Sequence, residues 1–183
     1  RLPAYLQQLQ MESNGKSVDE DGGPVSVDTM GVVWGEPGTD AQHSFFQALH
    51  QGTRVHPVEF VLAVPERADP HRRDLALLAN ALAQAEALMR GRDLRASLAE
   101  LIDDGVDDAE ARRLAPHKVH EGNRPSTTIL TGTLTPRAFG ALIALYEHKT
   151  ATLGWLWRIN SYDQWGVELG KRLASRTEPL LAG

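Results

Sequence analysis

The chain has 183 residues, a formal net charge of −5 at pH 7, 42% hydrophobic residues and no cysteine. These values predict a single globular domain over residues 1–183, and the absence of cysteine excludes disulfide and thiolate chemistry. The negative charge argues against nucleic acid as a partner. The sequence contains neither a signal peptide nor an apolar run fit to span a membrane. Because the chain begins at Arg1 rather than Met, we expect a processed product or a piece of a longer protein.

The first 35 residues are expected to form one helix, one loop and one strand. Residues 2–10 have the pattern of the tail of a helix, which Asn14-Gly15 ends. Residues 16–30 are polar and rich in Gly and Asp, which predicts a loop or a short irregular hairpin. The apolar run 31–35 lies between two glycines and predicts a buried strand.

A second helix is expected to begin near Thr39, because Thr39 and Gln42 form a capping-box pattern. It should stop at Gly52. The residues expected to face inward from it are Phe45, Phe46 and Leu49.

Two further strands are expected at residues 58–64 and 127–130. A long helix follows the first of them, with Asp69 at its N-cap and Pro70 at its first position. Apolar residues then recur along it at helical spacing: Leu75, Leu78, Ala79, Leu82, Ala85 and Met89.

The remaining elements are helices. Residues 93–102 and 107–114 predict two short, charged helices at the surface, and Thr135-Pro136 opens a long one that runs almost to Asn160. Strands that alternate with helices in this way are typical of an α/β layer fold with a parallel sheet.

The stretch 160–171 combines several unusual features. Ser161 and Gln164 form a second capping-box pattern, and Lys171 lies two turns beyond Gln164 on the same face of the helix that they would open. Glycines at 166 and 170 are costly in a helix, so their spacing indicates close approach of a backbone or a ligand. The alternative is a tightly packed helix with a capping Gln and a solvated Lys.

This stretch closely resembles the C-terminal signature of the phosphoglucose isomerase family. Five further blocks resemble the same family in order and spacing, so that the likeness covers essentially the whole chain: residues 11–16, 35–43, 50–53, 77–84 and 121–125.

The resemblance implies a three-layer SIS-type (sugar isomerase) α/β fold with a central parallel sheet flanked by helices. Residues 1–183 would form most of the second SIS subdomain and its C-terminal helices. The N-terminal half, with the phosphate-binding loop and the Arg that stabilises the enediolate, would lie outside this chain. The implied activity is the interconversion of glucose 6-phosphate and fructose 6-phosphate by ring opening and proton transfer through a cis-enediolate. It needs no metal and no cofactor, and it belongs to a cytoplasmic homodimer.

The resemblance also assigns roles to residues. Glu12 matches the base that moves the proton between carbons, Lys171 matches a group that assists ring opening, and Gln164 matches a residue near the phosphate of the substrate. Glu12 is expected near a helix C-terminus, where the dipole opposes a carboxylate and makes it a stronger base. The alternative is that Glu12 is a solvated residue before an Asn-Gly turn.

His43 matches the family's ring-opening histidine, which reaches into the active site of the partner subunit. We expect it in the first turn of the helix after Thr39, where the helix dipole favours a neutral imidazole. The alternative is a packed histidine bonded to a loop carbonyl. Arg124 is expected to hold a loop by pairing rather than to bind phosphate.

Three other histidines, His117, His120 and His148, lack the spacing of a metal site.

Two other functional readings compete with that of a glucose-phosphate isomerase. One is a non-catalytic SIS module that binds a sugar phosphate. The other is a related isomerase, either one with a different sugar-phosphate preference or the isomerase half of a fusion enzyme. If the chain is the C-terminal part of an isomerase, the isolated chain is expected to be inactive or nearly so, because it would lack the groups that hold the substrate and stabilise the enediolate.

Overall fold

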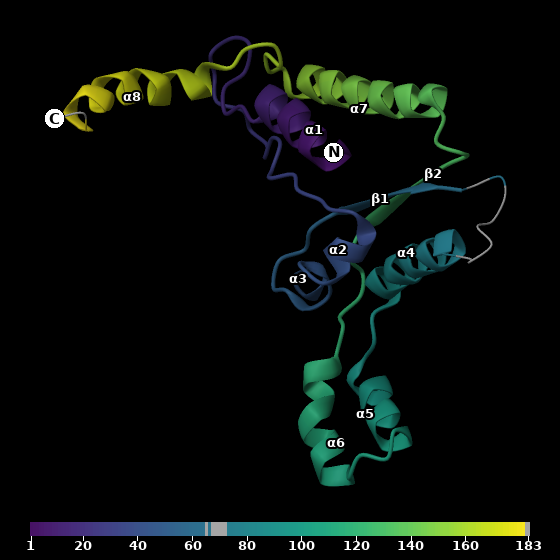
Figure 1. Cartoon of the computed structure of the whole chain (residues 1–183). Helices are drawn as coiled ribbons and strands as arrows, with labels where there is room; N and C mark the ends of the chain where they lie inside the picture. Colours follow the sequence, from purple (N-terminus) through teal and green to yellow (C-terminus); the bar gives the residue numbers. More distant parts are fainter. Residues whose placement is uncertain (65, 67–72, 182–183) are drawn as a thin grey trace. The chain divides into compact units, whose positions relative to one another are not determined.

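The computed structural model describes residues 1–64, 66 and 73–181 (Figure 1). They form two compact units, one made of residues 1–35 and 140–183 and the other of residues 36–139. The predicted cap of the long helix, Asp69 and Pro70, lies outside the described residues.

The second unit contains a parallel sheet of two strands, β1 (Val58–Ala63) and β2 (Ser126–Thr131). Val58 lies opposite Ser126 and Ala63 opposite Thr131. Parallel neighbours need a crossover connection, and the helices of residues 73–118 provide it. The two predicted strands and the α/β class are thus confirmed.

Helices α2 (Gly38–Gln42), α3 (Phe46–Gln51) and α4 (Arg73–Arg90) pack with β1 around one apolar core. Its buried members come from all three helices, and partly buried residues of β1 and of the α2–α3 turn complete it: Ala41, Phe46, Leu49 and Leu88, with Phe45, Val58 and Phe60. The rings of Phe46 and Phe60 lie 6.4 Å apart between centroids.

The helix predicted from Thr39 to Gly52 is wrong in its continuity and its cap, whereas its end at Gly52 and its inward-facing Phe46 and Leu49 are confirmed. Pro37 is the N-cap of α2, without a side-chain cap, and α2 ends at Gln42 before α3 begins. The Ser44 hydroxyl donates to the carbonyl of Asp40 at 3.0 Å and competes with the helical hydrogen bonds there.

Helix α4 confirms the predicted long helix, although its buried face differs from the one expected. Leu88 is fully buried, whereas Leu82 and Met89 are 49% and 62% exposed. The apolar residues of α4 therefore extend around more of the helix than the core of this unit covers.

Helices α5 (Leu94–Asp103) and α6 (Asp108–Leu114) confirm the two predicted charged helices and lie side by side in Figure 1. Asp93 and Asp107 cap them by accepting main-chain N–H groups. A short 3₁₀ helix, η2 (Ala115–Lys118), completes a small core with them. That core consists of Leu101, Ala111 and Ala115.

His120 lies beside this group, its ring stacked on His50 with 5.1 Å between centroids. Burial lowers the pKa of His120, and the charges of His50 and Arg92 lower it further, against the opposite effect of Glu100. The folded state therefore binds a proton on His120 less readily than the unfolded chain does.

We expect the free energy of unfolding to fall as the pH drops below 6.5, the ordinary pKa of histidine, towards the lowered pKa in the folded state. Urea unfolding midpoints above and below pH 6.5 measure this. His120→Gln should flatten the dependence, whereas His117→Gln, at an exposed position, should not. An unchanged slope in His120→Gln contradicts the assignment. The hydrogen bond from Lys118 is the main cause that lowers the pKa of the Glu100 carboxyl. Glu100 therefore affects the free energy of unfolding only below pH 4.5, outside the pH range of His120.

The first unit begins with α1 (Leu2–Gln7), which continues as a π-helix, η1 (Gln8–Glu12). This confirms the predicted N-terminal helix and extends it. Residues 16–30 form an irregular loop with one antiparallel bridge between Val18 and Pro24, as predicted. The predicted strand at 31–35 is wrong: these residues have no strand structure and Val32 is 72% exposed.

Helix α7 (Pro136–Trp157) confirms the predicted long helix, and the Thr135 hydroxyl caps it by accepting from the Ala138 N–H at 3.2 Å. A 3₁₀ turn, η3 (Trp165–Val167), and helix α8 (Glu168–Leu181) follow. None of the helices in the described part of the chain is both long and apolar enough to cross a membrane.

Candidate active site

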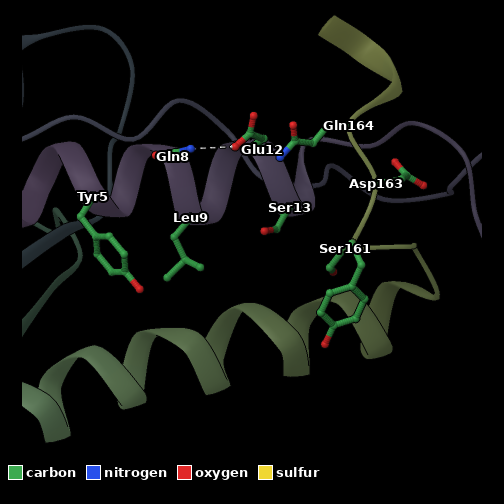
Figure 2. Close-up of a pocket in the computed structure, with 9 residues that line it drawn as sticks. Tyr5, Gln8, Leu9, Glu12, Ser13, Ser161, Asp163 and Gln164 are labelled. Atoms are coloured by element: carbon green, nitrogen blue, oxygen red, sulfur yellow. Dashed lines mark hydrogen bonds between the residues drawn. The ribbon is translucent and has the colours of Figure 1, made fainter. Parts of the chain in front are cut away.

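A cavity of about 350 Å³ opens in the first unit between the N-terminal helix and the segment before η3 (Figure 2). The helix and the residue after it contribute Tyr5, Gln8, Leu9, Glu12 and Ser13, and the facing segment contributes Ser161, Tyr162, Asp163 and Gln164. This volume is within the range of small-molecule sites. Most of the lining side chains are polar, which suits a hydrophilic ligand.

Glu12 is the last residue of the π-helix and lies half-buried at the cavity. Its Oε2 accepts a hydrogen bond of 3.2 Å from Gln8 Nε2, one turn earlier (Figure 2). π-Helical turns are rare and are frequently found at functional sites. The expected placement of Glu12 at the C-terminal end of a helix is confirmed, although the helix there is a π-helix.

Asn14 fixes the facing segment to this helix. It is fully buried, and its Nδ2 donates to the carbonyl of Thr150 on α7 at 2.9 Å. Its Oδ1 accepts from the Ser161 hydroxyl at 2.6 Å. Buried amides are stable only when such bonds are made, so Asn14 determines where Ser161 enters the cavity wall.

This bond also explains a failed prediction. Ser161 does not cap a helix, because its hydroxyl is committed to Asn14, and the helix predicted to start there begins only at Glu168. Gln164 therefore precedes α8, and the shared helix face predicted for Gln164 and Lys171 is wrong.

The close approach predicted at Gly166 and Gly170 occurs at another glycine. Around those two positions nothing in the described structure would lie within 4 Å of an added Cβ. At Gly154 on α7, an added Cβ would collide with the Ser161 hydroxyl and lie 3.4 Å from Asn14 Oδ1. Gly154 thus leaves room for the bond that shapes the cavity.

Tyr5 lies at the other end of the cavity. Its hydroxyl donates to Glu147 Oε1 on α7 at 3.0 Å. Burial raises the pKa of Tyr5, and the hydrogen bond and negative charge of Glu147 raise it further. Tyr5 is therefore a neutral hydrogen-bonding group at ordinary pH.

Of the four residues predicted for the site, Glu12 and Gln164 line this cavity together. Lys171 is exposed on α8 and is not among the lining residues. His43 belongs to the second unit, where it is exposed at the C-terminal end of α2. Its predicted position in the first turn of a helix is wrong, so the dipole argument for a neutral imidazole does not apply.

Arg124 has the structural position that its sequence context predicts. It is 4% exposed, and its guanidinium donates to the carbonyls of Arg54 and Gly52 at 3.1 and 2.9 Å. Its Nε is buried and has no hydrogen-bond partner among the described residues. A second cavity of about 350 Å³ lies beside it, with His50 and His117 also in its wall.

A metal site requires several ligating side chains close together. Within residues 1–64, 66 and 73–181, no group of three or more His, Cys, Asp or Glu is arranged to hold a metal ion.

Comparisons with known proteins match the whole length of the chain to one family. The profile of the phosphoglucose isomerase family matches residues 1–183. The glucose-6-phosphate isomerases of Methylocella silvestris and Mesorhizobium japonicum are 56% and 57% identical to the chain over 99% and 100% of its length. The chain spans about a third of the length of these curated relatives, 33% and 34% respectively.

A crystal structure of a glucose-6-phosphate isomerase from Chlamydia trachomatis superposes on 99% of the chain with a TM-score of 0.77 and 39% identity. The chain covers 32% of that protein. This likeness confirms the SIS-type α/β fold that the sequence motifs predict. The chain therefore belongs to the phosphoglucose isomerase family.

Proposed function

We propose that the complete protein carrying this chain is a glucose-6-phosphate isomerase, which interconverts glucose 6-phosphate and fructose 6-phosphate in glycolysis and gluconeogenesis. The observation that carries the proposal is that Glu12 and Gln164 line one polar cavity, although they are far apart in the sequence. Family membership of the whole chain supports it independently.

In this proposal Glu12 is the carbon base. After the sugar ring opens, its carboxylate takes the proton from one carbon and returns it to the neighbouring carbon through a cis-enediolate. A positioned base of this kind contributes about 10²–10⁴-fold to the rate. The amide of Gln164 binds near the phosphate end of the substrate.

Ring opening is assigned to His43 and Lys171, neither of which lines the cavity. We propose that His43 acts in the active site of a partner subunit, in a homodimer, and that its exposure on this chain leaves it available for that role. Lys171 acts from α8. The reaction requires no cofactor, and we assign the protein to the cytoplasm.

We further propose that residues 1–183 are most of the second SIS subdomain with its C-terminal helices. The phosphate-binding loop and the Arg that stabilises the enediolate then lie in other parts of the complete protein. A fusion of this isomerase to another domain is compatible with the same site.

The rival function is a non-catalytic SIS module that binds a sugar phosphate. A sensor needs binding groups such as Gln164, but it has no use for a carbon base at Glu12. Incubating the complete protein with fructose 6-phosphate in D₂O separates the two. We expect deuterium to appear on the substrate carbon that exchanges its proton. Binding of the sugar phosphate without incorporation contradicts the isomerase and favours the sensor.

The isolated chain is expected to turn over substrate at least about 10³-fold more slowly than the complete protein, because it would neither bind the phosphate nor stabilise the enediolate. A coupled assay of glucose 6-phosphate formation on both proteins measures this. Equal rates contradict the assignment of the phosphate site to other parts of the protein.

A further inference from the structure

Lys16 connects the two sides of the cavity. Its Nζ donates to three main-chain carbonyls, those of Glu12 at 3.1 Å, Ser13 at 3.0 Å and Asp163 at 2.8 Å. The Asp163 carboxylate also forms an ion pair with this ammonium, with Oδ1 3.3 Å from Lys16 Nζ. The side chains of Lys16 and Asp163 are only 17% and 22% exposed.

Two of these carbonyls belong to the end of the Glu12 helix. The last carbonyls of a helix lack intrahelical donors, and they carry the negative end of its dipole. The ammonium of Lys16 satisfies both of them. Its third bond is to the residue directly before Gln164, on the facing segment of Figure 2. One side chain thus connects the backbone of Glu12 to the backbone of Asp163, the neighbour of Gln164.

The three carbonyls use all three N–H donors of the ammonium. Lys16 therefore has no donor left for a substrate, and it is absent from the cavity wall. The hydrogen bonds of Lys16 therefore reach the cavity only through the residues that it fixes.

We propose that Lys16 is a positioning residue: it sets the separation of Glu12 and Gln164 so that one substrate contacts both. The inference rests on the proposed isomerase function. A displacement of about 1 Å at a catalytic group can cost about 10²-fold in rate. Loss of the three bonds should therefore reduce turnover more than it reduces the amount of folded protein.

The test is Lys16→Met in the complete protein, because methionine fills similar space without any donor. We expect kcat for fructose 6-phosphate to fall about 10–100-fold, at a temperature where circular dichroism shows the variant folded. The matched control is Arg92→Met in the second unit. Arg92 also bonds a main-chain carbonyl, that of Lys118, and a carboxylate, that of Glu100.

Arg92→Met is expected to lower the unfolding midpoint and to leave kcat within about threefold of the parent protein. Similar kcat losses in both variants would mean that lost stability alone explains the effect, and would overturn the proposal. A kcat for Lys16→Met within about threefold of the parent would overturn it too.

If Lys16→Met does not fold, Lys16→Arg replaces it. Arginine keeps the charge at the helix end, but its planar fork cannot direct donors at the same three carbonyls. We expect an unfolding midpoint close to the parent value with kcat lowered at least about fivefold, and an unchanged kcat overturns the proposal.

The parent protein and Glu12→Gln are assayed alongside. No activity in the parent would overturn the proposed function and this inference with it. An active parent, an inactive Glu12→Gln and an unaffected Lys16→Met would overturn the positioning role alone.

Discussion

Glu12→Gln is expected to lower kcat for the conversion of fructose 6-phosphate by about 10²–10⁴-fold, the contribution of a positioned general base. The amide has the size of the carboxylate and retains an oxygen that can accept from Gln8 Nε2, now 3.2 Å from Glu12 Oε2. It cannot take a proton from carbon. KM should change much less than kcat, because the substitution alters the proton acceptor and not the shape of the cavity.

The measurement is a coupled assay of the complete protein with both kcat and KM determined. Glu20→Gln is the matched control, since it makes the same chemical change at an exposed carboxylate of the first unit that pairs with Arg158. That variant should retain the parent rate. A Glu12→Gln enzyme with more than about a tenth of the parent kcat would remove Glu12 from the role of base.

Long elements of this fold could be predicted from the sequence because their signals are local. Helix α7 has Thr135-Pro136 at its start and an apolar pattern along its length, and both appear in the structure. The run 31–35 has the composition of a buried strand, but a strand also needs a partner, and pairing is not a local property. Its residues remain in irregular structure, where the Met11 sulfur accepts from the Val33 N–H at 3.4 Å.

The sequence motifs single out Glu12 and Gln164, which line one cavity, but they do not predict the geometry of that cavity. A Ser three residues before a Gln has the same pattern whether its hydroxyl caps a helix or bonds a distant side chain. In this chain Ser161 bonds Asn14, 147 residues away in the sequence, so η3 and α8 begin later than the capping box predicts. Nothing in the sequence signals the π-helix at Glu12, nor that Gly154 rather than Gly166 is the glycine in close contact.

Gly122→Ala is expected to destabilise the protein by about 3–5 kcal/mol, a large effect for the addition of one methyl group. Gly122 has φ +69°, a left-handed conformation that costs an L-residue about 1–2 kcal/mol. An added Cβ would also lie 2.7 Å from the carbonyl carbon and oxygen of Arg90 and 2.8 Å from the nitrogen of Gly91. These are backbone atoms at the end of α4, so no side chain can rotate to relieve the collision.

The collision at Gly122 lies where hydrogen bonds join the end of α4 to the segment that leads into β2. Arg92 and His120 exchange two main-chain hydrogen bonds of 2.8 and 2.9 Å, and Arg124 donates its N–H to the carbonyl of Leu88 at 3.0 Å. Separating the two backbones at Gly122 would strain these bonds on both sides. It would also displace the buried guanidinium of Arg124 from the carbonyls that it holds.

Gly105→Ala provides the control that separates the two costs. Gly105 has φ +80°, and an added Cβ there would meet nothing within 4 Å in the described structure, so alanine costs only the left-handed conformation, about 1–2 kcal/mol. The difference between the two variants, measured by urea unfolding of the complete protein, gives the free energy of the steric collision alone. Equal losses would show that the backbone yields at Gly122 without cost, and that the joint between α4 and β2 is not rigid. A larger loss at Gly122 would show that the close contact there constrains the path of the chain into β2.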